Sequence, residues 1–305
     1  MTYHLEFPDI PSERIDKYIC EQITDLSRSY IQQLIKSSSV FVNGKPCKAN
    51  YKCKISDQID IIYEDAKELE VTPENIPLDI IYEDQSIIIV NKPKNMVVHP
   101  AAGHSNGTLV NALLYHCKDS LSSINGVVRP GIVHRIDQNT TGILVVCKND
   151  NAHKSLAEQL KEHSITRKYH AICYGVIKDA VGTIDAPIGR HPVDRKKMAI
   201  NYKNGREAVT HYRVIKTLKN GYSYIECTLE TGRTHQIRVH MASIGHPILG
   251  DDVYGPKNSK IKNLTGQTLH AKTLGFIHPD TNKYVEFDSE LPDYFKQLLI
   301  KLDHE

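Results

Sequence analysis

The stretch Gly131-Ile-Val-His-Arg-Ile-Asp-Gln-Asn-Thr-Thr-Gly-Ile-Leu-Val-Val-Cys-Lys148 places one acidic residue, Asp137, between two apolar segments. Residues 143–146 are apolar and mostly β-branched, which predicts a buried strand. A plain turn needs little more than Gly, Asn or Asp. The simplest interpretation is that Asp137 caps a turn and Arg135 is solvated. An arginine two residues before an aspartate at the mouth of a buried strand instead favours a functional loop.

The order of residues in this loop resembles a known signature. His134-Arg135-Ile136-Asp137, followed by Thr140-Thr141-Gly142-Ile143-Leu144-Val145, is similar to the HRxD element of the RluA/RluD family of RNA pseudouridine synthases. The resemblance implies that Asp137 is the catalytic residue, because the aspartate of this element has that role in the family. The match is long and unusual in composition, which makes it specific. Ile136 replaces the commoner Leu, and Gln138-Asn139 replace a commoner charged pair.

Two later motifs match the same family in the family's order. Thr166-Arg-Lys-Tyr-His-Ala171 contains Tyr169, and the resemblance implies that this tyrosine packs on the target base. The segment Leu229-Glu-Thr-Gly-Arg-Thr-His-Gln-Ile-Arg-Val-His240 contains Arg238, which by resemblance pairs with Asp137. An opposite charge at close range favours the ionised form of a carboxylate. Arg135 is expected to bind substrate, by filling the gap left by the base or by contacting flanking phosphates.

The remaining landmarks are assigned to other roles. Leu249-Gly-Asp-Asp-Val-Tyr-Gly255 and Leu269-His-Ala271 are predicted to serve the architecture, not catalysis. Arg233 either contacts RNA or braces the fold. Residues 190–206 include Arg195-Lys196-Lys197 and are predicted to form an exposed basic loop or hairpin that grips an RNA strand. The resemblance extends from about Ser12 to Phe287.

Composition narrows the function classes. The chain has 305 residues, 40% of them hydrophobic and 24% charged, as in an ordinary globular protein. No segment approaches the roughly 20 apolar residues of a membrane span, and the N-terminus does not look like a signal peptide, so we expect a cytoplasmic protein. The seven cysteines form no CxxC pair, and the sequence contains no HExxH motif and no phosphate-binding loop. We therefore expect neither a metal nor a small-molecule cofactor.

The N-terminal region carries a local positive charge although the net charge of the chain is only +2. Residues 26–56 contain no Asp or Glu. Apolar spacing predicts a helix from Ile15 to Leu26 and a second from Arg28 to Lys36, with Ser27 as its cap. A strand at 40–42 and the hairpin signal Asn43-Gly44 follow, and alternating isoleucines at positions 55, 59 and 61 complete a small sheet. This pattern resembles an S-four-like RNA-binding module. We predict RNA phosphate contacts from four basic residues: Arg28, Lys36, Lys45 and Lys48.

Three segments follow from these patterns: an RNA-binding module at 12–65, an acidic linker at 66–75 and a catalytic domain at 76–305. In the last, we predict a helix capped by Thr108, a helix capped by Asp150, a hairpin at Asn220-Gly221 and a helix over 233–243. Strands dominate without strict βαβ alternation. The fold class is therefore predicted as α+β, with a mixed and largely antiparallel sheet in the catalytic domain and a small α/β module before it.

The predicted function is isomerisation of uridine to pseudouridine in structured RNA by a single catalytic aspartate. The attached module favours large-subunit ribosomal RNA, with transfer RNA as the alternative. Two other classes stay open: a non-catalytic RNA-binding protein of ribosome assembly, and a glycosidic hydrolase, which usually needs two carboxylates. RNA is the expected partner, and we expect a monomer that does not bind membranes.

Overall fold

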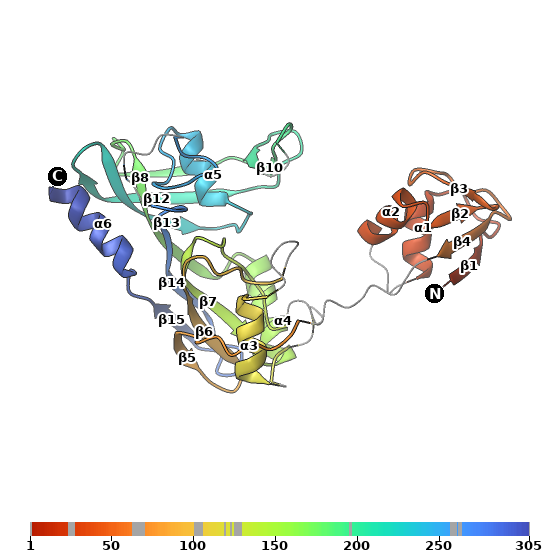
Figure 1. The fold of residues 1–305 in the computed structure, drawn as a ribbon, viewed down its shortest axis with the longest axis horizontal. Coiled ribbons are helices and arrows are strands. Elements are labelled where there is room, and N and C mark those ends of the chain that lie inside the picture. The colour runs from red at the N-terminus through yellow and green to blue at the C-terminus, as the bar shows by residue number, and fades with distance from the viewer. Residues whose placement is uncertain are drawn as a thin grey trace. The chain divides into compact units, whose positions relative to one another are not determined.

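The computed structural model describes residues 2–23, 28–62, 71–100, 106–118, 120–122, 124, 130–194, 197–256, 261 and 264–304, with the side chains of Ser29 and Gln33 also left out. The chain divides into two compact units, Met1–Glu70 and Val71–Glu305 (Figure 1). The predicted linker at 66–75 falls partly on residues outside the described ones. Its last part packs with the larger unit, because Val71 is buried in the core of that unit.

The small unit packs two helices on an antiparallel sheet. Helices α1 (Ile15–Gln22) and α2 (Arg28–Lys36) contact each other, and the strand order is β1 (Thr2–Glu6), β4 (Gln58–Ile62), β2 (Val40–Val42), β3 (Lys45–Pro46). The predicted cap Ser27 and the predicted end Leu26 lie outside the described residues. Ile59 and Ile61 are fully buried, as predicted, whereas the prediction for Ile55 is wrong, since it lies before β4 and is 58% exposed.

The larger unit is built on a mixed sheet that confirms the predicted fold class. Within the described residues the order is β5 (Ile80–Glu83), β6 (Ile87–Lys92), β7 (Thr141–Cys147), β14 (Leu269–Ile277), β8 (Thr166–Tyr174), β13 (Tyr222–Leu229), β12 (Val209–Leu218) and β9 (Val181–Asp185), with β15 (Tyr284–Asp288) paired to β14. Strands β7 and β14 run parallel, whereas the other pairs in the sheet are antiparallel.

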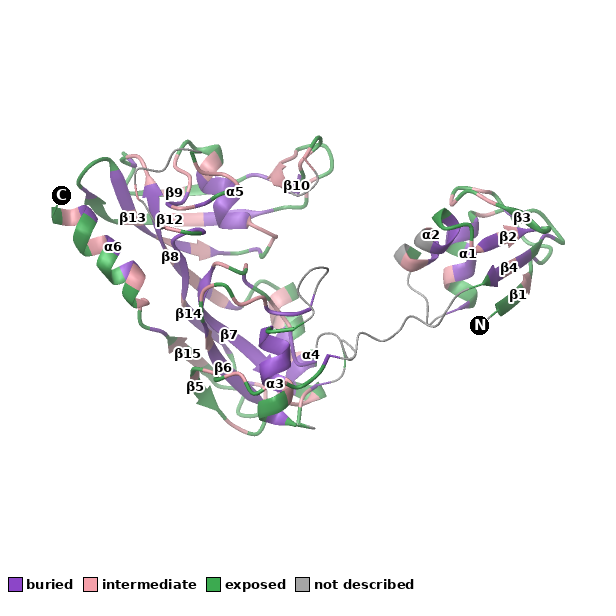
Figure 2. Cartoon of the chain, viewed as in Figure 1, coloured by how far each residue is buried: buried purple, intermediate pink, exposed green. Residues whose placement is uncertain are grey.

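Two helices cover opposite faces of the sheet at β6 and β7. Alternate residues of these strands pack with α3 (Leu109–Cys117) on one face and with α4 (Asp150–Lys161) on the other. Because both faces are covered, every residue of β7 is buried (Figure 2). Helix α5 (Gln236–Ser243) contributes Ile237 and Met241 to the same core as α3. Ile132 and Ile136, in the segment before β7, are buried in this core as well.

Helix starts follow local capping chemistry, and two differ from prediction. Thr108 caps α3 as predicted and forms a capping box with Asn111. The N-cap of α4 is Asn149, whose side chain accepts a hydrogen bond from the Ala152 amide, so the prediction of Asp150 was wrong by one residue. Helix α5 begins at Gln236 and not at Arg233, because His235 has a left-handed backbone with φ of 57°.

The parallel pair depends on one glycine. Gly142 has φ of +109°, and a Cβ at this position would lie 2.2 Å from the carbonyl oxygen of Ala271 on β14. Any other residue at position 142 would therefore push β7 away from β14. Since the loop that carries Asp137 leads into β7, this close approach also fixes where that loop ends.

A short hairpin and a C-terminal helix complete the unit. Strands β10 (Ile188–Arg190) and β11 (Met198–Ile200) pair as an antiparallel hairpin in the region predicted to be basic, although Arg195 and Lys196 lie outside the described residues. Asn220 and Gly221 have positive φ and turn β12 into β13, as predicted. Helix α6 (Asp293–His304) packs Phe295, Leu298 and Leu302 into a separate cluster.

Candidate active site

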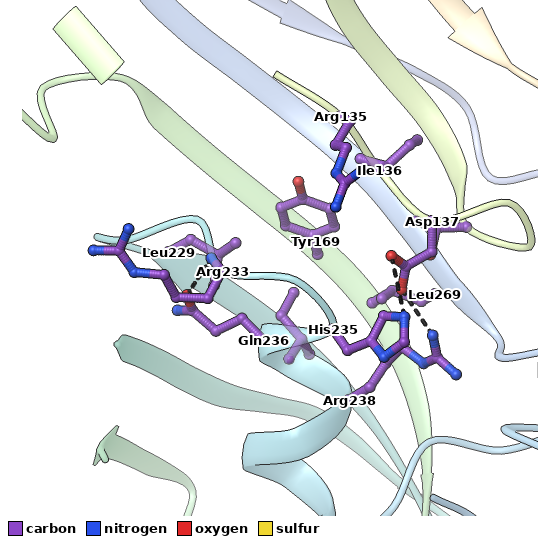
Figure 3. Close-up of a pocket in the computed structure, with 12 residues that line it drawn as sticks. Arg135, Ile136, Asp137, Tyr169, Leu229, Arg233, His235, Gln236, Arg238 and Leu269 are labelled. Carbon is purple, nitrogen blue, oxygen red and sulfur yellow. Dashed lines mark hydrogen bonds and ion pairs between the residues drawn. The ribbon is translucent and has the colours of Figure 1, made fainter. Parts of the chain in front are cut away.

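The loop before β7 presents Asp137 to a pocket. The Asp137 carbonyl accepts a hydrogen bond from the Thr140 amide, which closes a turn, and the carboxylate is about a quarter exposed. Arg238 Nη1 donates to Asp137 Oδ2 at 2.9 Å (Figure 3). The structure therefore brings together Asp137 and Arg238, the pair that the family resemblance implied, from positions 101 residues apart.

Arg238 is held in place by a second carboxylate. Its Nε and Nη2 donate to Asp251 at 2.7 and 2.9 Å, and both side chains are almost completely buried. Asp251 also accepts from the amides of Val253 and Tyr254. Burial alone would lower the pKa of Arg238, but the two carboxylates outweigh burial and raise that pKa. Arg238 therefore stays charged and points a fixed donor at Asp137.

Tyr169 forms the apolar wall of the pocket. It lies on β8, is 9% exposed, and lines the pocket with Ile136, Leu229 and Leu269. Figure 3 shows its ring and the carboxylate of Asp137 at the same cavity. Burial raises the pKa of the Tyr169 hydroxyl, so the phenol remains neutral. An aromatic ring with one face on a cavity is a suitable surface for a base taken out of its stack.

Arg135 stands at the entrance. It is exposed, and its guanidinium makes two long contacts, 3.4 Å to His99 Nε2 and 3.3 Å to Thr234 Oγ1. These weak contacts leave the side chain able to move toward a bound strand. The structure thus gathers Asp137, Arg135, Tyr169 and Arg238 around one pocket.

His235 is a site residue that sequence reasoning did not single out. Its Nε2 lies 3.8 Å from Asp137 Oδ1, and its Nδ1 is 2.9 Å from the Tyr254 hydroxyl. Burial lowers the pKa of His235, although Asp137 opposes this effect, so the ring is neutral near pH 7. The sequence signal that could have identified His235 as a site residue is its position between Arg233 and Arg238 in the matched motif.

Lys92 was also missed by sequence reasoning. It is fully buried at the end of β6, and its Nζ donates to the carbonyl oxygens of Pro93, Met96 and Gln138 at 2.8, 2.8 and 2.9 Å. Burial lowers the pKa of Lys92 to about 7, and the charge of Asp137 opposes that shift. Because Gln138 follows Asp137 directly, Lys92 ties the loop that carries Asp137 to strand β6.

We expect Lys92→Met to destabilise the chain by roughly 3 kcal/mol, because three part-buried carbonyl oxygens lose their donor. The rate of the reaction should also fall at temperatures where the variant is folded, since the loop at Asp137 loses an anchor. Thermal and denaturant unfolding measure the first effect. The exposed Lys178 offers a control, and Lys178→Met should change stability by less than about 0.5 kcal/mol. A Lys92→Met protein as stable as Lys178→Met would contradict this role.

The basic residues predicted in the small unit have different surroundings. Lys36, Lys45 and Lys48 are exposed. Arg28 is half-exposed, but its Nε and Nη2 donate to Asp16 at 3.2 and 3.1 Å. Burial would raise the pKa of Asp16, but hydrogen bonds led by Arg14 outweigh it and lower that pKa to about 2. Arg28 therefore holds α1 and α2 together, whatever else it contacts.

Two negative observations apply to the described part of the chain. No group of three or more His, Cys, Asp or Glu side chains is placed there to hold a metal ion. No helix in that part is both long and apolar enough to cross a membrane.

Comparison with known proteins identifies the class. A family model described as RNA pseudouridylate synthase matches residues 86–243, and an S4 domain model matches residues 13–59. The chain belongs to the RNA pseudouridylate synthase family, as the resemblance predicted, and is an enzyme that forms pseudouridine in RNA.

Similar proteins cover nearly the whole chain. An uncharacterized RNA pseudouridine synthase of Bacillus subtilis is 52% identical over 95% of this chain and 94% of its own length. The ribosomal large subunit pseudouridine synthase D of Zymomonas mobilis is 49% identical over 95% of this chain and 93% of its own. Among solved structures, human RNA pseudouridylate synthase domain containing 1 matches with a TM-score of 0.58 and 26% identity, covering 79% of this chain and 98% of that one.

Proposed function

We propose that this enzyme converts uridines of large-subunit ribosomal RNA to pseudouridine, with Asp137 as its catalytic carboxylate. The observation that carries the catalytic part is Asp137 held at 2.9 Å by a buried arginine, at a pocket walled by Tyr169. The ribosomal target is supported by relatives named ribosomal large subunit pseudouridine synthase D, at 41–49% identity over most of the chain.

The chemistry needs few groups because uridine and pseudouridine contain the same atoms. The bond between uracil N1 and the sugar C1′ breaks, the uracil turns, and C5 bonds to C1′. The proton on C5 leaves and N1 gains one, so no water or oxidant is consumed. Asp137 attacks the sugar or the ring, or removes a sugar proton, and each of these roles requires the ionised carboxylate that Arg238 favours. Tyr169 and the leucines around it keep the detached uracil from water.

The residues at the site have separate tasks in this proposal. Tyr169 supports the base that has left the stack, and Arg135 fills the space that the base vacates or contacts the neighbouring phosphates. Asp251 keeps the guanidinium of Arg238 aimed at Asp137. The glycosidic-hydrolase alternative would need a second catalytic carboxylate. Two other carboxylates lie near Arg238: Asp251 is fully buried and bonded to it, and Asp252 lies 4.0 Å from Nη2 with a side chain that is 71% exposed and makes no closer ion pair with Arg238.

A strain that lacks the gene tests the target. Pseudouridines in its ribosomal and transfer RNA are mapped by carbodiimide modification and primer stops, then mapped again after the gene is restored. We expect one or a few positions of large-subunit ribosomal RNA to lose and regain the modification. Loss restricted to transfer RNA would contradict the ribosomal target while leaving the enzyme class intact.

We also propose that the S4 domain holds RNA through the exposed lysines of α2 and the following hairpin. Replacing Lys36, Lys45 and Lys48 together by Glu should weaken RNA binding roughly tenfold or more and lower the slope of log K against log salt by about 2 to 3. Arg28 is excluded from this variant because its loss would remove one of the two arginines that pair with the buried Asp16. A salt series of binding measurements gives both numbers.

The control makes the same charge change elsewhere. Lys178, Lys219 and Lys283 are exposed on the larger unit, and their joint replacement by Glu should leave most of the affinity and of the salt slope in place. If the two triple variants behave alike, the S4 domain has no special part in holding RNA.

A further inference from the structure

A second cavity adjoins the pocket at Asp137. It has a volume of about 330 Å³ and shares Arg135, Asp137 and Tyr169 with that pocket. Its own walls add Arg167 and His163, and Arg233 lines both spaces. Of the described residues that line it, Asp137 is the one carboxylate, and Arg238 already binds it. The cavity therefore presents three arginines and little negative charge to balance them.

Arg167 is the most unusual of these arginines. It lies on β8, two residues before Tyr169, and is only 6% exposed. Its Nη2 donates to the backbone oxygen of Glu230 at 2.6 Å, whereas its Nε is buried with no hydrogen-bond partner in the described part of the chain. No carboxylate among those residues lies within ion-pair distance of it. A buried guanidinium without an anion is costly, so an anion from outside is expected here.

The adjoining loop leaves room for that guanidinium. A Cβ at Gly232 would lie 2.8 Å from Arg167 Nη1, and the φ of Gly232 is not in the left-handed region. Alanine at position 232 would therefore fit the backbone but displace the arginine head. Arg233, the next residue, donates its Nε to the Glu207 carbonyl at 2.8 Å, with its terminal nitrogens unbonded among the described residues. Two guanidinium groups thus stand at one wall of the cavity.

The ring of His134 adds no positive charge to this cavity. His134 lines the cavity, and its Nε2 accepts a hydrogen bond from the Val145 amide. Burial, together with the charge of Arg167, lowers the pKa of His134 to about 4, so its ring is neutral at pH 7. Arg167 and Arg233 therefore give this wall a positive charge that no physiological pH removes.

We propose that this cavity binds a backbone phosphate of the RNA substrate, next to the uridine whose base enters the Asp137 pocket, with Arg167 and Arg233 as the phosphate ligands. The site rests on the proposed function. A flipped nucleotide must be held by its backbone, and every RNA linkage carries the anion that the cavity lacks. Arg167 and Tyr169 share one strand, so bound phosphate and bound base are positioned by the same rigid element.

The test combines a protein change with a substrate change. Short RNAs that contain the modified uridine are made with one neutral methylphosphonate at each phosphate around the uridine in turn. Wild-type, Arg167→Gln and Gly232→Ala enzymes are compared by single-turnover rates. The same RNAs are titrated for binding against proteins that also carry Asp137→Asn, with and without added inorganic phosphate. Arg213→Gln is the matched control, because Arg213 is an exposed arginine on β12 that pairs with Glu226 and lines neither cavity.

One methylphosphonate position should lower the wild-type rate constant or affinity by roughly tenfold to hundredfold, since a charge-assisted pair is lost. The same position should change Arg167→Gln by less than about twofold, and Gly232→Ala by an intermediate factor. Arg213→Gln should behave like wild type. If Arg167→Gln does not fold, Gly232→Ala is compared with wild type instead, because this variant keeps the guanidinium of Arg167 but displaces it.

Equal methylphosphonate effects in wild type and in both variants would overturn the phosphate site. The proposal would also be overturned if inorganic phosphate weakened RNA binding but no single methylphosphonate position did. The binding measurements keep this result separate from the proposed function. An enzyme that makes no pseudouridine in ribosomal RNA fails the proposed target, whereas coupling between Arg167 and one phosphate is still visible in dissociation constants.

Discussion

Asp137→Asn should lower the rate of pseudouridine formation by at least about 10⁴-fold while RNA affinity changes by less than about threefold. Asparagine keeps the shape of the side chain and removes its charge and its basicity. The fold should survive, because Arg238 keeps its two bonds to Asp251. Single-turnover conversion measures the rate, and filter or anisotropy binding measures the affinity.

Asp179 provides the control for this substitution, because it is an exposed aspartate of the same unit. Asp179→Asn should convert RNA at the wild-type rate. An Asp137→Asn protein with full activity would remove Asp137 from the chemistry and leave the pocket without a catalytic carboxylate among its described lining residues.

Arg238→Lys should lower the rate by roughly 100-fold or more and leave RNA binding nearly unchanged. A lysine carries the charge but cannot make the three bonds that the guanidinium makes to Asp137 and Asp251. The carboxylate of Asp137 then loses its fixed partner. Rates measured below the unfolding temperature of the variant separate this effect from any loss of stability.

Arg238→Ala should do more, since it leaves Asp251 buried without its cation. We expect a loss of about 3–5 kcal/mol in the free energy of unfolding, which denaturant titration measures. The pair of exposed Arg213 and partly buried Glu226 is the comparison, and Arg213→Lys should change both rate and stability little. A wild-type rate in Arg238→Lys would show that the ion pair at Asp137 is not needed for the reaction.

Much of the fold followed from local sequence patterns. The apolar run at 143–146 became the fully buried strand β7, and the Thr108 cap and the Asn220-Gly221 turn were correct because each acts within a few residues. The start of α5 was not predictable from spacing, since the left-handed backbone at His235 depends on its surroundings. Strand β1 was missed although Tyr3 and Leu5 alternate with polar residues, because the strand is short and largely exposed.

The candidate site divides in the same way. Asp137, Tyr169 and Arg238 came from motif resemblance, and the structure places them at one pocket. The second role of Arg238, its bond to Asp251, could not be predicted from the sequence. That bond depends on a loop that follows α5 and folds back onto the helix. Lys92 and Arg167 were hidden for a similar reason. The sequence around a basic residue does not show whether it is solvated or buried, because tertiary contacts decide which carbonyls or cavities surround it.

Product analysis of large-subunit ribosomal RNA incubated with the purified enzyme tests the isomerase chemistry most directly. The RNA is digested to nucleosides, separated and weighed by mass spectrometry, and modified sites are mapped by primer stops after carbodiimide treatment. We predict pseudouridine at a few discrete positions with wild type, none with Asp137→Asn, and no free uracil with either. Release of free uracil, or RNA left unchanged by the wild-type enzyme, would contradict a single-carboxylate isomerase acting on this RNA.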